Sequence, residues 1–285
     1  MARALVGTSG WVYPHWRGWF YPPKLPSRKW LAFLAERLAT VEINASFYRL
    51  QRPECFARWR AEVPPGFVFA VKGSRYITHM RRLDCGRAPL ANFFAQGLLL
   101  LGAQLGPILW QLPPRFRFDA ERAARFFDAL PVDVAAAERL ARGHDDRLND
   151  RAVSTAPDGR ERRLRHALEV RDPSWLADDA LELLIERNIA LVTADAAGRH
   201  PFSLARTADF AYLRLHGAER LYGGSYTDAQ LDFWAERATD ALATGADAFV
   251  YFDNDERGFA AHNAIALASR LHGSRAQRNP MSTSR

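Results

Sequence analysis

Eight short apolar runs with strand-like composition alternate with longer segments of helical spacing along the 285-residue chain. The expected strands are residues 4–8, 40–44, 67–72, 108–111, 167–171, 190–195, 211–216 and 248–253. The expected helices are residues 27–38, 53–61, 90–103, 119–130, 175–187, 227–243 and 257–271. Regular strand–helix alternation favours a parallel sheet covered by helices, and eight repeats predict a single closed α/β barrel of the TIM type, (β/α)8. An open doubly wound sheet is the alternative, but no glycine-rich dinucleotide fingerprint follows the first strand.

Two segments lie outside this alternation. Residues 142–165 are polar and have almost no apolar periodicity, so we expect an inserted loop that is disordered or forms a lid. Residues 273–285 are predicted to be a disordered tail. The expected organisation is therefore one barrel domain over residues 1–272 with one insertion.

Composition excludes several classes of protein. No apolar run reaches the roughly 20 residues of a membrane helix, and the N-terminus lacks the pattern of a signal peptide, so we expect no membrane partner. Cys55 and Cys85 are the only cysteines, too few for a disulfide framework or a thiolate zinc site. We therefore expect a cytoplasmic protein. The sequence identifies no protein partner.

The net charge of +7 is unevenly distributed. Residues 1–87 contain fifteen Lys and Arg against five Asp and Glu, whereas residues 88–141 and 166–269 together contain thirteen against twenty-two. This asymmetry is consistent with a face that attracts an anionic partner, or with surface charge that has no such role.

Polar residues alternate with branched apolar residues in three of the expected strands. Glu42 and Asn44 do so in the second strand, Glu169 and Arg171 in the fifth, and Tyr212, Arg214 and His216 in the seventh. In a barrel the apolar set faces the helices and the polar set points inward, at the carboxyl ends where barrel active sites lie. Lys72, Gln111, Asp195 and the run Asp253–Asn254–Asp255 end other strands. A buried plug of salt bridges is the structural alternative, but such pairs stabilise poorly compared with apolar packing, so we expect a functional pocket.

The pocket residues allow acid–base chemistry. Glu42, Glu169 and Asp195 are candidate general acids or bases, and His216 is a candidate proton carrier. The same carboxylates with His79 or His216 could ligate a divalent ion such as Mg or Mn, although no metal motif of fixed spacing is present.

Three loops carry possible binding features. The glycine-rich loop 222–226 precedes a helix start at Thr227, and the basic loop 73–82 follows the third strand; both could hold an anion, and the basic loop could equally be a solvated turn. The loop after the first strand is aromatic, and Trp11 and Tyr13 are its candidates for stacking on a ligand.

Several segments together resemble the YecE-like family, domain of unknown function 72. They are GTSGW (7–11), FYP (20–22), VEINASFYRL (41–50), FVFAVKGSRYITH (67–79), LWQLPP (109–114), LEVRDPSW (168–175), YLRLHG (212–217) and YFDND (251–255). The resemblance covers about residues 5–270 and implies a TIM barrel but no established activity. The family pattern matches at Glu42, Asn44, Tyr48, Lys72, His79, Gln111, Glu169, Arg171, Asp195, Arg214, His216 and Asn254. It departs at Asp253, where the family usually has asparagine, and the insertion at 142–165 is longer than usual.

Three functions remain open at this point. The first is a hydrolase or phosphodiesterase-type enzyme acting on a phosphate-bearing substrate, such as a nucleic acid. In it Glu42, Glu169, His216 and Asp195 are catalytic, and the substrate is bound by Asn44, Tyr48, Lys72, His79, Gln111, Arg171, Arg214, Asn254 and Trp11. This hypothesis predicts that Glu169→Gln abolishes turnover and leaves folding intact. The second is a non-catalytic nucleic-acid-binding protein, and the third is an enzyme on a neutral sugar or small metabolite.

Overall fold

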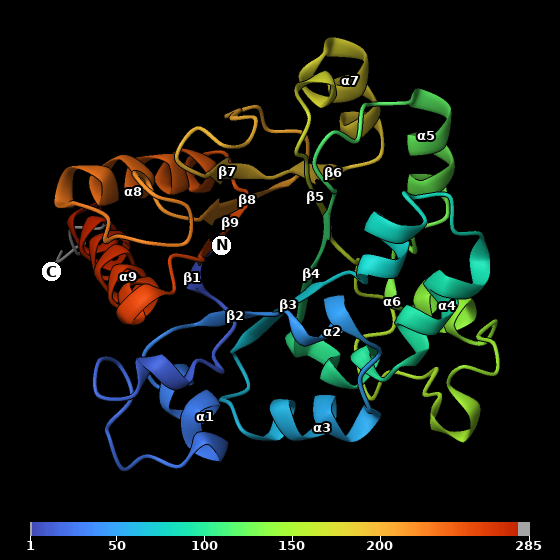
Figure 1. Cartoon of the computed structure of the whole chain (residues 1–285), viewed down its shortest axis with the longest axis horizontal. Helices are drawn as coiled ribbons and strands as arrows, with labels where there is room; N and C mark the ends of the chain where they lie inside the picture. Colours follow the sequence, from blue (N-terminus) through green and yellow to red (C-terminus); the bar gives the residue numbers. More distant parts are fainter. Residues whose placement is uncertain (1, 279–285) are drawn as a thin grey trace, which may run out of the picture.

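The computed structural model describes residues 2–278. Within this range nine parallel strands form one sheet in the order β6-β5-β4-β3-β2-β1-β9-β8-β7. Their bounds are β1 Ala4–Ser9, β2 Thr40–Ile43, β3 Val68–Lys72, β4 Leu105–Gln111, β5 His166–Glu169, β6 Ile189–Leu191, β7 Thr193–Asp195, β8 Phe210–Leu215 and β9 Asp247–Phe252. The strands lie at the centre of the molecule and the helices surround them (Figure 1).

The sixth barrel strand is divided into β6 and β7. Only Val192 separates the two, and its amide donates to the Leu168 carbonyl of β5 at 2.9 Å. β6 pairs with β5, whereas β7 pairs with β8, so the chain itself joins the two edges of the sheet. The predicted TIM-type barrel of eight strand positions is therefore confirmed, with one position split.

Nine α-helices surround the strands in the described range. They are α1 Trp30–Ala35, α2 Ala45–Tyr48, α3 Pro53–Ala61, α4 Arg87–Ala95, α5 Ala120–Asp128, α6 Val134–Ala141, α7 Asp178–Glu186, α8 Asp228–Ala243 and α9 Phe259–Arg278. Helix α8 starts at Thr227 as expected, and a capping box is present there, because Thr227 and Gln230 bond each other's backbone amides. The predicted helix over 90–103 is instead α4 followed by a 3-10 segment, Leu98–Gln104, because Gly97 takes a left-handed conformation.

The barrel interior has two layers. Its lower part is a closed apolar cluster in which alanines of β3, β5, β6 and β7 face larger side chains such as Phe210 and Phe249. Above it the polar residues of β2, β5 and β8 point inward, as the alternation predicted: Glu42, Glu169 and Arg214 are all buried. A larger apolar cluster fills the space between strands and helices. The polar layer therefore lies on a packed apolar floor.

The insertion packs against the outer helices. The Val153 amide donates to Ala95 of α4, and the Arg162 side chain donates to Gly102 at 2.7 Å. Arg160 forms an ion pair with Glu138 of α6 at 2.9 Å. Residues 142–165 are thus held along α4 and α6 and do not cover the barrel mouth, contrary to the expected disordered loop or lid.

The C-terminal helix is longer than the sequence indicated. α9 continues to Arg278, so residues 273–278 of the expected tail are helical, and residues 279–285 lie outside the described range. None of the helices in residues 2–278 is long and apolar enough to cross a membrane.

Candidate functional site

The guanidinium of Arg214 lies at the centre of the barrel mouth. Its Nη2 is 2.8 Å from Glu42 Oε1 and its Nε is 3.2 Å from Glu42 Oε2, while Nη1 is 2.6 Å from Glu169 Oε2. Nη2 also donates to Asp253 Oδ2 at 3.2 Å. Because β2, β5 and β9 each supply one of these carboxylates, a single cation connects three strands across the mouth.

His216 lies between two of the same carboxylates. Its Nε2 is 2.9 Å from Glu169 Oε1, and its Nδ1 is 2.9 Å from Asp253 Oδ2. A carboxylate only accepts hydrogen bonds, so both short contacts are satisfied when both ring nitrogens carry a proton. The ring is fully buried, and each of its two nitrogens lies beside a carboxylate oxygen.

The remaining bonds of Glu42 come from neutral groups. Ser9 Oγ donates to Oε1 at 2.6 Å, and the Tyr212 hydroxyl donates to Oε2 at 2.7 Å. Asn44 Nδ2 donates in turn to Ser9 Oγ at 3.0 Å. Both oxygens of Glu42 are therefore occupied, and its carboxylate is fully buried.

Electrostatics keep the buried acids charged. Burial alone would raise the pKa of Glu169, but Arg171, Arg214 and His216 together hold it well below its usual range. Burial also acts to raise the pKa of Asp253, and Arg214 and His216 outweigh that effect and lower it. The side chain of Asp253 is 15% exposed, whereas those of Glu42 and Glu169 are completely buried. Asp253 is thus the carboxylate of this network that reaches the open mouth.

Positive groups gather on the β3 and β5 side of the mouth. Burial and the charge of Arg214 lower the pKa of Lys72 to about 8, and the ammonium lies 4.4 Å from the centre of the Phe47 ring. Burial lowers the pKa of His79 to about 4, with further contributions from Lys72, Arg75 and Arg171. Arg171 forms an ion pair with Glu169 at 2.6 Å. Within residues 2–278 no carboxylate lies within ion-pairing distance of Lys72 or Arg75.

Several buried polar atoms around the mouth have no hydrogen-bond partner in the described part of the chain. They are Asn44 Oδ1, Arg171 Nε, His200 Nε2 and Asn254 Oδ1. Other such atoms of the described residues lie away from the mouth, on Gln104, Arg122, Asp158, Arg162 and Arg237. Leaving a buried polar atom unpaired is costly, so those at the mouth mark positions where a polar ligand or water can bind.

The carboxylates do not fit a divalent metal ion. All three converge on Arg214, whose guanidinium lies at the point where a cation bound by them would lie. Nowhere in residues 2–278 are three or more His, Cys, Asp or Glu side chains grouped so that they could hold a metal. These side chains therefore do not form the Mg or Mn site that the sequence allowed.

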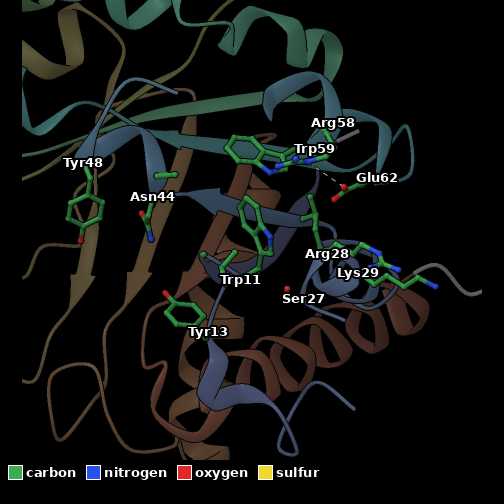
Figure 2. Close-up of a pocket in the computed structure, with 14 residues that line it drawn as sticks. Trp11, Tyr13, Ser27, Arg28, Lys29, Asn44, Tyr48, Arg58, Trp59 and Glu62 are labelled. Carbon is green, nitrogen blue, oxygen red and sulfur yellow. Dashed lines mark ion pairs between the residues drawn. The ribbon is translucent and has the colours of Figure 1, made fainter. Parts of the chain in front are cut away.

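A pocket of about 840 Å³ opens beside the mouth, between the loop after β1 and helices α2 and α3 (Figure 2). Its wall contains Trp11 and Trp59, whose rings meet edge to face at 5.4 Å, and the exposed Tyr48. Asn44 and Tyr13 line the side of the pocket next to the barrel mouth, since both also bond Ser9.

Comparison with known proteins identifies the family. The family model described as "Protein of unknown function DUF72" matches residues 5–284. The chain belongs to the DUF72 family. It is 24% identical to UPF0759 protein YunF of Bacillus subtilis, over 91% of this chain and 94% of that protein.

Two crystal structures of DUF72 family proteins are similar to this DUF72 protein. The one from Thermotoga maritima has a TM-score of 0.73 and 25% identity, over 95% of this chain and 99% of that chain. The one from Enterococcus faecalis has a TM-score of 0.70 and 19% identity, over 95% and 96% of the two chains, and it shows the fold alone. The resemblance noted in the sequence is thus confirmed, and it brings no established activity.

Other expected site residues of this DUF72 protein lie at the edges of the mouth. Asp195 accepts from the Tyr226 hydroxyl at 3.0 Å, and burial raises its pKa. Asn254 is completely buried and donates to Gly224 and Asn263, so it holds the loop after β8 to α9. Gln111 is half-buried at the end of β4, and Tyr48 lies in the pocket, 67% exposed.

The glycine-rich loop 222–226 already binds an anion of its own. The Glu256 carboxylate accepts from the Gly224 amide at 3.3 Å and forms an ion pair with Arg220. The expectation that this loop binds an external anion is therefore not supported by its geometry. The basic loop after β3 instead forms a five-residue π-helical turn, Tyr76–Met80, which places His79 beside Phe47 at 5.1 Å.

Sequence reasoning missed three members of the network as site residues. Ser9 was not among the expected site residues, and Tyr212 was recognised in the strand alternation without a role. The run Asp253–Asn254–Asp255 was recognised at the end of its strand, but only Asn254 was chosen as a site residue. Asp253 directly follows β9, and β9 pairs with β8, so it lies beside Arg214 and His216.

Proposed function

We propose that this DUF72 protein is an enzyme that uses acid–base chemistry on a phosphate-bearing substrate bound in the barrel mouth. One observation carries the proposal. The network exposes one carboxylate, Asp253, in a mouth that also contains the cationic side chains of Lys72 and Arg171, while Glu42 and Glu169 have both oxygens engaged.

The substrate phosphate would bind on the β3 and β5 side. Arg171 Nε is buried without a protein acceptor, while its Nη2 contacts Glu169, and Lys72 has no carboxylate partner within the described residues. Phosphate oxygens are strong acceptors, and charge-assisted bonds to them are about twice as strong as neutral ones. His79 is neutral at pH 7, since its pKa is about 4, and it can donate or accept without adding charge.

Proton transfer would divide between Asp253 and Lys72. Oδ2 of Asp253 receives both bonds from Arg214 and His216, and the opposite oxygen, Oδ1, takes part in neither of them. In phosphoester hydrolysis a water bound at Asp253 attacks phosphorus and gives its proton to that carboxylate, and the ester P–O bond breaks. The leaving oxygen takes a proton from the Lys72 ammonium, whose pKa of about 8 makes it a better acid than an ordinary lysine at neutral pH.

In this arrangement the fully buried groups are positioning residues. Glu42 and Glu169 hold Arg214 and His216, which in turn orient Asp253 and keep it ionised. This division of roles differs from the one predicted from the sequence, in which Glu42 and Glu169 act directly on substrate.

The test is a turnover assay with p-nitrophenyl phosphate and bis(p-nitrophenyl) phosphate, with neutral p-nitrophenyl glycosides as the comparison. We expect phosphate-ester turnover that Asp253→Asn and Lys72→Met each lower by at least about 100-fold, the usual contribution of a general acid or base. The rate of the native enzyme should fall above about pH 8, as Lys72 loses its proton. Glycoside turnover without phosphate-ester turnover would contradict the proposal and favour the neutral-sugar enzyme.

A further inference from the structure

The pocket beside the mouth has a composition of its own. Tyr48 gives it exposed aromatic surface, the largely buried Trp11 and Trp59 form part of its wall, and Arg28, Lys29 and Arg58 lie on the side away from Tyr48 and Asn44 (Figure 2). Its volume of about 840 Å³ lies in the range of small-ligand sites, roughly 300–1,000 Å³. Neither the acid–base network nor the phosphate site proposed above accounts for this pocket.

The charge of the pocket is positive. Arg28 and Lys29 are exposed on a 3-10 turn, Ser27–Lys29, and within residues 2–278 neither forms an ion pair. Arg58 is 3.7 Å from Glu62, which is the one acidic residue in the lining. Arg28 and Lys29 are therefore two cations without an acidic partner beside aromatic surface. Proteins that bind single-stranded nucleic acids use this combination, because the cations contact phosphates and the aromatic rings stack on bases.

The mouth and the pocket are connected through Asn44. Its Nδ2 bonds Ser9 in the mouth network, and its Oδ1 is buried without a partner and belongs to the pocket lining. An unpaired acceptor at this position calls for an N–H or O–H donor from a bound molecule. A nucleobase supplies such donors on its edge, next to the face that stacks.

We infer that this pocket binds one unpaired nucleotide of a single-stranded nucleic acid, with the base against Tyr48 and a neighbouring phosphate at Arg28 and Lys29. The inference rests on the proposed function, because it names the substrate class whose phosphodiester the mouth would act on. A base inside a duplex is stacked on both faces, so the pocket selects single strands or flipped nucleotides.

The test compares two labelled oligonucleotides of ten phosphodiester units, one of thymidine and one abasic, by fluorescence anisotropy at low and moderate salt. Both have the same charge, and they differ only in the bases. We expect the thymidine strand to bind at least about fivefold more tightly, which is the lower end of the effect of stacking one base. Equal affinity for the two strands would overturn the inference.

Variants separate the two parts of the pocket. Tyr48 is 67% exposed, so Tyr48→Ala leaves the fold intact and should remove most of the preference for the thymidine strand. The double variant Arg28→Ala, Lys29→Ala should bind both strands more weakly. The slope of log binding constant against log salt concentration should become less steep by about 1.4, the value for two phosphate contacts. The matched control, Arg139→Ala with Arg142→Ala, removes the same charge from exposed positions on and next to α6 and should change neither. If the two double variants lose oligonucleotide affinity equally, the attraction of the protein for the strands is nonspecific, and the inference is also overturned.

Failure of this inference is distinguishable from failure of the proposed function. Turnover of p-nitrophenyl phosphate depends on Asp253 and Lys72 and does not require a nucleobase in the substrate. If the protein hydrolyses p-nitrophenyl phosphate but does not prefer the thymidine strand, the nucleotide pocket alone is rejected. A base preference lost in Tyr48→Ala, in a protein that hydrolyses no phosphate ester, supports the pocket and rejects the enzyme.

Discussion

Arg214 binds the Glu42 carboxylate through two parallel contacts, Nη2 to Oε1 at 2.8 Å and Nε to Oε2 at 3.2 Å. Such a bidentate pair fixes the plane of the guanidinium and leaves Nη1 to reach Glu169. The pair therefore sets the geometry of the whole mouth, because the positions of Glu169, His216 and Asp253 all depend on the orientation of one side chain.

Removal of Arg214 is predicted to destabilise the protein strongly. Arg214→Met leaves three carboxylates facing one another without their cation, and breaking a buried ion pair on one side typically costs about 3–5 kcal/mol. Urea unfolding monitored by tryptophan fluorescence measures the loss. Arg214→Lys is the matched control for charge: a lysine cannot reproduce the bidentate contact, so we expect intermediate stability and lost activity. A loss below about 1 kcal/mol in Arg214→Met would show that the network contributes little to the fold.

Replacement of Glu169 by glutamine is predicted to affect folding as well as activity. Oε1 accepts from His216 and contacts Arg171, and Oε2 accepts from Arg214, so the amide NH2 of glutamine must face a donor at either position. We therefore expect a loss of unfolding free energy of about 3 kcal/mol or more, in contrast to the intact folding expected from the sequence. Thermal unfolding of Glu169→Gln beside the exposed Glu121→Gln tests this. Equal melting temperatures would restore the earlier expectation.

The predictable part of the site was its location. Alternation in β2, β5 and β8 showed that Glu42, Glu169 and Arg214 point into the barrel, since successive side chains of a strand face opposite sides. The sequence does not indicate which charged groups saturate one another. Glu42 and Arg214 are 172 positions apart, and their pairing depends on the stagger of strands around a closed sheet.

The fold was predictable for a similar reason, with local exceptions. Helix α3 begins and ends where its periodicity does, because Pro53 is favourable at its first turn. The sixth strand was predicted as one run over 190–195, and it is two, with Val192 between them, since β6 and β7 pair with different neighbours. The path of residues 142–165 depends on tertiary contacts, such as that of Arg162 with Gly102, that no local pattern reveals.

Lys72 is predicted to make stability depend on alkaline pH. Its pKa is about 8 in the folded protein and 10.5 for an ordinary lysine, because burial penalises the charged form. The unfolded chain therefore binds more protons between these values, and the free energy of unfolding should rise as the pH increases from about 8 to 10.5. In Lys72→Met this rise should be absent, and the variant should be more stable than the native protein at pH 7. Identical pH profiles of the two proteins in urea unfolding would contradict the assignment of a buried amine whose pKa is lowered by burial.

His166 is predicted to make stability depend on acidic pH. It lies in the wall of the barrel away from the mouth. Trp110 Nε1 donates to its Nδ1 at 3.2 Å, so the proton is on Nε2, which lies 2.9 Å from the Pro131 carbonyl. Burial lowers the pKa of His166 to about 4, and a neutral ring satisfies both contacts. Because the unfolded pKa is near 6.5, the unfolded state binds more protons between pH 6.5 and 4, and stability must fall as the pH decreases through this window.

His166→Gln should reduce the steepness of that fall. One proton corresponds to a slope of about 1.4 kcal/mol per pH unit, so the variant should lose up to this amount from the dependence measured by urea unfolding between pH 6.5 and 4. The pKa values of His79 and His200 are also lowered to about 4, so these two rings should contribute to the slope that remains in His166→Gln. An unchanged slope would mean that His166 is protonated in the folded protein, which the Trp110 N–H at Nδ1 does not allow.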